Sequence, residues 1–329
     1  MQSKTVAPSK NTVKIASHIQ NELGVDSIAH LTCVSSTKEE VRQRIEELKA
    51  NGIQNILALR GDIPKDADFP IPNQYKYAYE LIEDIKSQGD FCIGAACYPE
   101  GHVESAHKEE DILHLKQKVD CGVDFLTSQM FFDNSVFYNF LYRIREKGIT
   151  VSCDLNYRKK LWTKEKACQV MSELCKYVDV CISNEEDAKD VFGIEAENTD
   201  IYGGKLNKEG YKSVAKQLMD TFGFEKVAIT LRSSISASDN DWAGMLYDGE
   251  NYCFSKEYHL HIVDRVGGGD SFGGGLIYAL LSGKDTQSAV EFAVAASALK
   301  HSIEGDYNFV TVDEVEKLAG GNASGRVQR

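Results

Sequence analysis

This 329-residue sequence lacks any run of about 18 apolar residues that could cross a membrane, and nothing in it resembles a signal peptide. It also lacks an excess of positive charge, because 37 Lys and Arg stand against 50 Asp and Glu, for a net charge of −13. We therefore expect small molecules as its partners, neither nucleic acid nor membrane, and a cytoplasmic location. These features leave the oligomeric state open.

The nine cysteines include no C-x-x-C pair and no Cys/His spacing typical of zinc. Several lie in or beside apolar, strand-like runs: Cys33, Cys92, Cys97, Cys121, Cys153 and Cys181. We expect them to be small buried hydrophobic residues in a reducing compartment. The sequence thus predicts no metal bound directly by protein side chains.

The periodicity of the chain predicts its fold class. Strand-like runs separated by helical stretches recur about every 30 residues, the size of a βα crossover unit. We expect an α/β protein with a mostly parallel sheet of about eight βα units, although periodicity does not distinguish a closed barrel from an open sheet. Because no Ser/Gly/Pro-rich linker interrupts the chain near Ile149, the sequence predicts one continuous domain.

The first half of the chain places polar side chains at the ends of successive predicted strands. They are His30, Arg60, Asp62, Tyr98, His102 and Gln129. Each alone could be a solvated loop residue, but as a set they are typical of a cofactor site on the rim of a βα barrel. Asp111 and Lys118 lie on one predicted helix, where a surface ion pair is an equal alternative.

Four motifs in this half resemble methylenetetrahydrofolate reductase over about residues 11–149. They are HLTC at 30–33, NGIQNILALRGD at 51–62, IGAACYPEGH at 93–102 and KVDCGVDFLTSQMFFD at 118–133. The resemblance implies a TIM barrel that uses FAD to reduce methylenetetrahydrofolate. It also implies that FAD would be surrounded by His30, Arg60, Asp62, Tyr98, His102, Asp111 and Lys118. Gln129 would contact the folate, and Asp62 would lie near the contact between flavin and folate.

This half departs from the family in three places. The Thr/Gly-rich loop after the family's second strand (VTYGA-like) is reduced to TVAPS. The FEFFPP-like strand, whose glutamate acts as general acid in the family, has no counterpart, and neither do the last two barrel strands after Ile149. General acid catalysis typically contributes about 10²–10⁴-fold to rate. We therefore expect FAD binding to survive, and efficient folate reduction to be lost.

The second half contains the glycine cluster DRVGGGDSFGGG at 264–275. Gly267, Gly268 and Gly269 can turn the backbone tightly and present N–H groups at the amino end of a helix, an arrangement that binds phosphate. Asp270 could then take a proton from an attacking hydroxyl. The alternative is a glycine-rich turn in which Asp270 only caps the helix.

Several motifs of the second half resemble 2-keto-3-deoxygluconate kinases of the ribokinase-like family, over about residues 148–329. They are VSCDLNYRKKLW, CISNEEDAKDVFG, VAITLRSS, DRVGGGDSFGGGLIYAL and NASGRVQR. The resemblance implies Asp270 as catalytic base and Gly267–Gly269 as anion hole. It further implies Mg-ATP organised by Asn184 and Glu186, nucleotide contacts from Arg232 and Ser233, and sugar-acid contacts from Asn156 and Arg158. The family's GG-x-x-x-N sugar motif is absent, so we expect weak sugar phosphorylation.

Together these features predict a chimera. Residues 1–148 would be a partial, flavin-reductase-like TIM barrel, and residues 149–329 a Rossmann-like, nucleotide-binding ribokinase half. We expect an engineered α/β protein with vestigial FAD or ATP sites and no efficient native reaction. Two alternatives remain open: a kinase that phosphorylates 2-keto-3-deoxygluconate with ATP, and an FAD-binding module or weak methylenetetrahydrofolate reductase.

Overall fold

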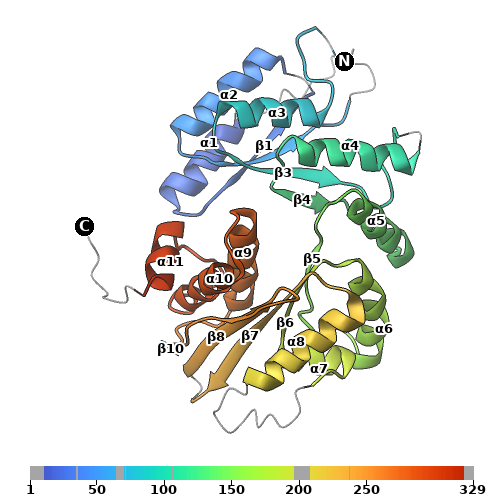
Figure 1. Cartoon of the computed structure of the whole chain (residues 1–329). Helices are drawn as coiled ribbons and strands as arrows, with labels where there is room; N and C mark the ends of the chain where they lie inside the picture. The colour runs from blue at the N-terminus through green and yellow to red at the C-terminus, as the bar shows by residue number, and fades with distance from the viewer. Residues whose placement is uncertain are drawn as a thin grey trace. The chain divides into compact units, whose positions relative to one another are not determined.

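The computed structural model describes residues 11–34, 36–63, 70, 72–105, 107–195, 208–236 and 238–321. The NASGRVQR motif lies outside the described residues. The predicted α/β class with parallel strands is confirmed, but the chain divides into two compact units, Met1–Ile149 and Thr150–Arg329 (Figure 1). The prediction of one continuous domain is corrected by this division. Each unit has its own sheet, because β4 pairs with β3 in the first and β5 pairs with β6 in the second.

The first unit is built on a four-stranded parallel sheet in the order β1-β2-β3-β4. Its strands are β1 (Ile28–Thr32), β2 (Asn55–Leu59), β3 (Cys92–Cys97) and β4 (Phe125–Ser128). Its helices are α1 (Asn11–Ser17), the π-helical turn η1 (His18–Glu22), α2 (Lys38–Ala50), α3 (Ala78–Gln88), α4 (Lys108–Asp120) and α5 (Asn134–Glu146). Since all four strands run in parallel, their carboxyl ends meet at one edge of the sheet, where ligands of such sheets bind.

Alternating side chains explain how the helices of this unit cover the sheet. Ile56 and Ala58 of β2 are buried in one core with Ile45 of α2 and Ile82 of α3. The prediction that the cysteines are buried is confirmed for Cys33, Cys97 and Cys181, whereas Cys121 and Cys153 are only partly buried. It is wrong for Cys92, which is exposed. Cys92 is the first residue of β3, and the buried side chains begin with the next residue.

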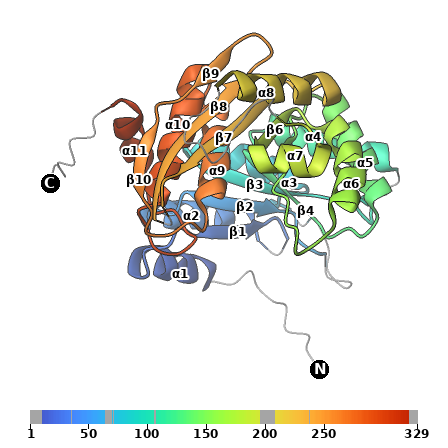
Figure 2. The same cartoon turned by 90° about the horizontal axis from the view of Figure 1, so that it is seen from below.

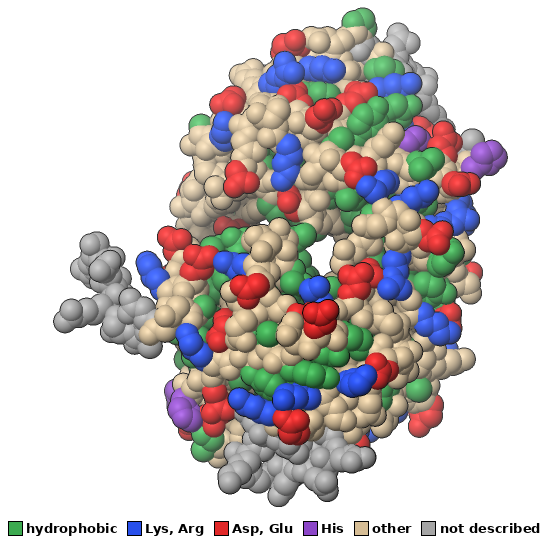
Figure 3. Space-filling model, in the orientation of Figure 1, with side chains coloured by type: hydrophobic (Ala, Val, Ile, Leu, Met, Phe, Trp, Pro, Cys, Tyr) green, Lys and Arg blue, Asp and Glu red, His purple; other side chains and the backbone are tan. Residues whose placement is uncertain are grey.

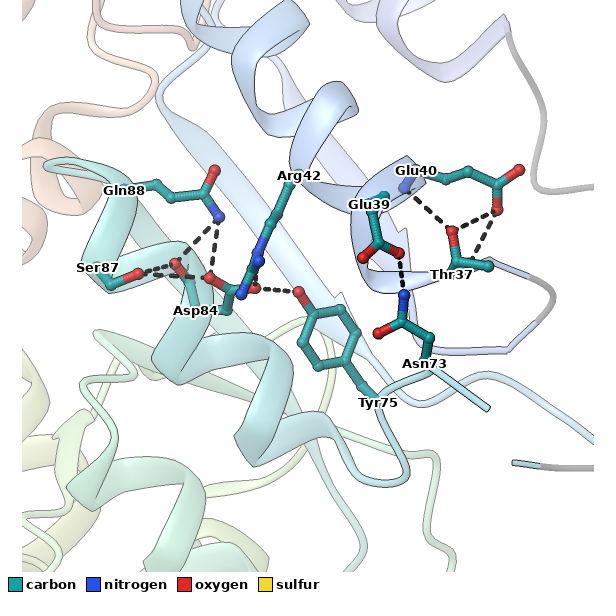
Figure 4. Close-up of polar contacts among 9 residues, drawn as sticks. All are labelled: Thr37, Glu39, Glu40, Arg42, Asn73, Tyr75, Asp84, Ser87 and Gln88. Carbon is teal, nitrogen blue, oxygen red and sulfur yellow. Dashed lines mark hydrogen bonds and ion pairs between the residues drawn. The ribbon is translucent and has the colours of Figure 1, made fainter. Parts of the chain in front are cut away.

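A polar network joins α2 to α3 (Figure 4). Arg42 Nε of α2 donates to Asp84 Oδ2 of α3 at 2.8 Å. The hydroxyl of Tyr75, which precedes α3, donates to the same carboxylate oxygen. Thr37 and Glu40 form the capping box that starts α2, as its Ser/Thr–Glu spacing predicts. These contacts fix α2 and α3 relative to each other.

The second unit has a mixed sheet in the order β10-β8-β7-β6-β5, with β9 paired to β8. Its strands are β5 (Ser152–Asp154), β6 (Val180–Asn184), β7 (Lys226–Ser234), β8 (Asp239–Tyr247), β9 (Tyr252–Phe254) and β10 (Tyr258–His261). Its helices are α6 (Lys164–Leu174), the 3-10 turn η2 (Cys175–Tyr177), α7 (Glu185–Phe192), α8 (Lys208–Phe222), α9 (Gly268–Leu281), α10 (Thr286–Lys300) and α11 (Val312–Ala319). Strands β8 and β9 pair antiparallel.

Helices cover both faces of this second sheet (Figure 2). Val227 and Ile229 of β7 are buried in one core with α6, α7 and α8, whereas Ala228 between them is buried with α9 and α10. This period of two is that of a strand buried on both sides. The arrangement leaves the carboxyl ends of β5, β6 and β7 beside the start of α9, where the second cavity described below lies.

On the face shown in Figure 3, acidic and basic side chains are interspersed over both units. Within the described part of the chain, no helix is both long enough and apolar enough to cross a membrane.

Candidate functional sites

The first unit contains a cavity of about 340 Å³ at the carboxyl ends of β2 and β3, closed on one side by α4. Its lining includes six of the residues predicted around FAD: Arg60, Asp62, Tyr98, His102, Asp111 and Lys118. Two further predicted residues do not line it. His30 lies exposed on β1, and Gln129 lies exposed just after β4. The structure thus brings most of the predicted set together, while their roles remain predictions.

Lys118 of α4 lies inside this cavity rather than in a surface pair with Asp111. Its Nζ donates to the carbonyl oxygen of Ala96 at 2.9 Å and lies 5.9 Å from the ring centroid of Tyr98. Burial lowers the pKa of the Lys118 ammonium from its ordinary value, although the Asp111 carboxylate opposes that shift. A partly desolvated cation therefore faces whatever occupies the cavity.

Glu104, which sequence reasoning missed, pairs with Arg60 at the same cavity. The two guanidinium nitrogens donate to the two carboxylate oxygens, Nη1 to Oε2 at 2.6 Å and Nη2 to Oε1 at 2.8 Å. These hydrogen bonds hold the pKa of Glu104 below its ordinary value. An anionic ligand would have to compete with Glu104 for this guanidinium.

Three aromatic rings that sequence reasoning also missed line the cavity: Tyr77, Tyr79 and His114. Tyr77 stacks on Tyr79 with ring centroids 5.8 Å apart, and on His114 with centroids 5.9 Å apart. The alternating tyrosines of YKYAY at 75–79 are the sequence signal that could have indicated them. Aromatic faces of this kind can stack on planar ligand rings, and Lys118 adds a cation to the same lining.

The second unit contains a cavity of about 260 Å³ where β5, β6 and β7 end and α9 begins. Its lining includes six of the residues predicted for the kinase site: Asn156, Arg158, Asn184, Glu186, Arg232 and Gly269. Ser233, Gly267, Gly268 and Asp270 are not part of that lining. Asp270 is exposed in the first turn of α9, and Gly267 is the helix cap, so Asp270 is not the capping residue that the alternative interpretation required.

The glycines at the start of α9 have separate structural reasons. Gly267 has φ +78°, and a Cβ there would lie 2.2 Å from the carbonyl oxygen of Asp306. A Cβ on Gly268 would lie 2.5 Å from Cε1 of His301. A Cβ on Gly269 would meet open space, since nothing lies within 4 Å. The first two glycines permit close packing, and the third keeps the cavity open beside first-turn N–H groups that have no intrahelical partner.

Two carboxylates that were not among the predicted site residues, Asp154 and Asp187, also line this cavity. Asp187 accepts hydrogen bonds from the Tyr157 N–H at 3.1 Å and from Asn184 Nδ2 at 2.8 Å. Burial, reinforced by the Asp154 carboxylate, raises the pKa of Asp187 to about 6. Burial also raises the pKa of Asp154, with the charge of Asp270 contributing. These carboxylates add negative charge to the cavity, but the described residues include no group of three or more His, Cys, Asp or Glu side chains that could hold a metal ion.

Two protein-family models match this chain. The methylenetetrahydrofolate reductase family model matches residues 3–197, and the pfkB family carbohydrate kinase model matches residues 102–312. Methylenetetrahydrofolate reductase 2 of Saccharomyces cerevisiae is 43% identical over 138 residues, 40% of this chain and 23% of that protein. The 5,10-methylenetetrahydrofolate reductase of Escherichia coli is 37% identical over 140 residues, 43% of this chain and 46% of that protein.

Solved structures match the chain more broadly. The 2-dehydro-3-deoxygluconokinase of Thermotoga maritima is 32% identical with a TM-score of 0.54, covering 95% of this chain and 89% of that one. A PfkB family carbohydrate kinase of Listeria grayi shares the fold at 22% identity and a TM-score of 0.50, covering 78% and 95%.

The part of the chain that matches covers only 23% of the length of the Saccharomyces cerevisiae reductase and 26% of that of the Zea mays methylenetetrahydrofolate reductase (NADH) 1. Each family model nevertheless matches more than half of this chain, and the two overlap over residues 102–197. The prediction of a two-part fusion is therefore confirmed. The chain belongs to the methylenetetrahydrofolate reductase family through its first part and to the pfkB carbohydrate kinase family through its second.

Proposed function

We propose that the second unit binds Mg-ATP, with the phosphates at the first turn of α9. The observation that carries this proposal is the open space at Gly269, which lines the 260 Å³ cavity in the first turn of α9. The positive end of the helix dipole favours an anion at this point. Arg158 and Arg232 line the same cavity and supply further positive charge.

Each residue of the cavity has a definite part in this proposal. Asn184 and Glu186 would organise Mg²⁺, joined by Asp187, whose side chain Asn184 already holds. Asp270 would accept the proton of an attacking hydroxyl, and Asn156 and Arg158 would meet a sugar acid. The acceptor we propose is 2-keto-3-deoxygluconate, also called 2-dehydro-3-deoxygluconate, after which the Thermotoga maritima kinase is named. Transfer would be slow, because the sequence lacks the GG-x-x-x-N motif.

Calorimetric titration of the purified chain with Mg-ATP tests the binding. We expect saturable binding by wild type and by Asp270→Asn, since Asp270 serves the transfer and does not line the cavity. Phosphorylation of added 2-keto-3-deoxygluconate should be slow in wild type and absent in Asp270→Asn. Absence of Mg-ATP binding by wild type would refute the proposal.

A second candidate function, FAD binding, is favoured by a separate observation in the first unit. Six predicted residues and a set of stacked rings line one cavity there. We propose that this unit is a fragment of a βα barrel, supported by its sequential parallel strand order. Bound FAD would supply hydride transfer, Lys118 and His102 would face its phosphates, and Tyr77 and Tyr79 its planar rings.

Soaking the protein in excess FAD, desalting it and comparing flavin absorbance near 450 nm with protein concentration tests this second function. Near-stoichiometric retained flavin would support it, and none would refute it. We further infer that the fusion performs neither parental reaction efficiently and is of engineered origin, because each part lacks a substrate-binding element of its family.

A further inference from the structure

Lys300, the last residue of α10, is a fully buried lysine with 0% exposure. Its Nζ donates to the backbone carbonyl oxygen of Ile303 at 3.0 Å. Lysine is almost never fully buried unless it is paired with a carboxylate, because removing an ammonium from water is expensive. Here the hydrogen bond goes to a carbonyl group, so the burial calls for another explanation.

The side chain of Lys300 lies against the glycines that begin α9. A Cβ on Gly267 would lie 3.2 Å from Lys300 Cε. The same end of α10 holds the next residue of this turn, since Ser297 Oγ donates to the carbonyl oxygen of Gly268 at 2.7 Å. The backbone N–H of Val263 donates to the carbonyl oxygen of His301 at 2.9 Å, which fixes the segment that leads into the turn.

Asp264 is a negatively charged group whose pKa the Lys300 charge affects. Asp264 accepts hydrogen bonds from the N–H groups of Val266 at 3.0 Å and Gly305 at 2.9 Å. These bonds, with a smaller contribution from the Lys300 charge, hold the pKa of Asp264 below its ordinary value. Asp264 does not line the cavity, but its carboxylate is held at Val266, directly before Gly267, where it would repel a phosphate bound at the turn. The Lys300 charge offsets that repulsion.

We infer that Lys300 is a positioning residue for the phosphate site, whose buried ammonium holds the Gly267–Asp270 turn in its anion-binding form and adds positive charge behind it. This inference rests on the proposed Mg-ATP site. It gives the buried lysine a role that an apolar side chain of similar length could not fill, because such a side chain has neither the charge nor a donor for the carbonyl oxygen of Ile303.

The test compares Lys300→Met, which has a similar length and no charge, with Lys300→Gln, which keeps a donor for Ile303 but has no charge. Lys216→Met, which removes a charge from the surface of α8, is the matched control. Each variant is titrated with Mg-ATP and with adenosine, which lacks phosphates, and unfolded in urea. We expect both Lys300 variants to bind Mg-ATP about tenfold more weakly with unchanged adenosine affinity. The urea midpoint of Lys300→Met should fall below that of wild type, because the carbonyl oxygen of Ile303 loses its donor, and that of Lys300→Gln should fall less.

Unchanged Mg-ATP affinity in both Lys300 variants, or an equal loss for adenosine, would overturn the inference while leaving Mg-ATP binding intact. If wild type itself fails to bind Mg-ATP, the proposed function falls. Hydrogen exchange of the amides at 267–270 in the free proteins then tests the remaining part of the inference, that Lys300 holds the Gly267–Asp270 turn. Faster exchange in Lys300→Gln and Lys300→Met than in wild type supports it, and equal exchange refutes it.

Discussion

Arg60 and Glu104 form a bidentate ion pair at the cavity of the first unit, with N–O distances of 2.6 and 2.8 Å. The Arg60 side chain is 18% exposed and that of Glu104 is 51% exposed. The guanidinium is therefore held in the lining, while its partner can turn outward into water. Glu104 thus occupies the position that an anionic ligand of this cavity would take.

Replacing Glu104 by Gln should strengthen FAD binding severalfold, because Arg60 is then free to pair with a phosphate. The gain should shrink as salt concentration rises, since both the old and the new pair are partly solvated. FAD titration followed by flavin fluorescence measures it. Glu109→Gln, which removes a charge from the exposed first turn of α4, is the control. Equal affinities of wild type and Glu104→Gln would contradict this competition.

Gly269 and Gly274 provide a matched test of the phosphate site. At both positions an added Cβ has nothing within 4 Å, so alanine should stabilise α9 by up to about 1 kcal/mol in each case. Only Gly269 lines the cavity. We expect Gly269→Ala to weaken Mg-ATP binding at least tenfold and Gly274→Ala to leave it unchanged, measured by calorimetry beside urea unfolding. Equal affinities of the two variants would place the phosphates elsewhere.

Asp187 should make stability fall as pH rises. Its pKa is about 6 in the folded protein and about 3.9 in an unfolded chain, so the folded state binds more protons between these values. The stability from this group is fully present below about pH 4 and is lost as pH rises through about 6. Asp187→Asn does not titrate, so urea unfolding between pH 4 and 7 should show a less negative slope of stability against pH. A slope equal to that of wild type would show that Asp187 titrates normally.

The two cavities could be predicted from the sequence because they depend on a general property of parallel sheets. The carboxyl ends of the strands meet at one edge, so Arg60 and Tyr98, far apart in the chain, were expected to lie together. Local patterns place the start of α2 at Ser36 or Thr37, and in the structure Thr37 forms the capping box with Glu40. Such features require only short-range information and the polarity of the strands.

Other features depend on pairings that no local pattern encodes. The hydrophobic runs of β4 and β5 predict strands, but nothing in them specifies whether the two strands pair with each other. In the sequence, Glu104 resembles an ordinary acidic loop residue, and only the fold brings Arg60 beside it. Asp187 resembles an ordinary acidic residue at the start of a helix, and only the fold brings Asp154 near it. In the sequence, Lys300 resembles a solvent-exposed lysine at the end of a helix. Its burial depends on the packing of α10 against the start of α9.

The network of Tyr75, Asp84 and Arg42 gives a stability test confined to the first unit (Figure 4). Tyr75 is 2% exposed, and its hydroxyl donates to Asp84. Tyr75→Phe leaves that carboxylate with fewer donors, so the free energy of unfolding should fall by about 1.5–3 kcal/mol, the range for hydrogen bonds to charged groups. Urea unfolding followed by far-UV circular dichroism measures the loss.

Tyr142→Phe is the control for this loss, because the hydroxyl of Tyr142 donates to Glu146 on the exposed side of α5 at 2.9 Å. We expect its effect to stay within about 0.5 kcal/mol, as for most surface changes. Trp162 and Trp242 both belong to the second unit, so their fluorescence reports the unfolding of that unit separately. A loss in Tyr75→Phe no larger than that in Tyr142→Phe would mean that Arg42 and Gln88, which also donate to Asp84, satisfy the carboxylate without Tyr75.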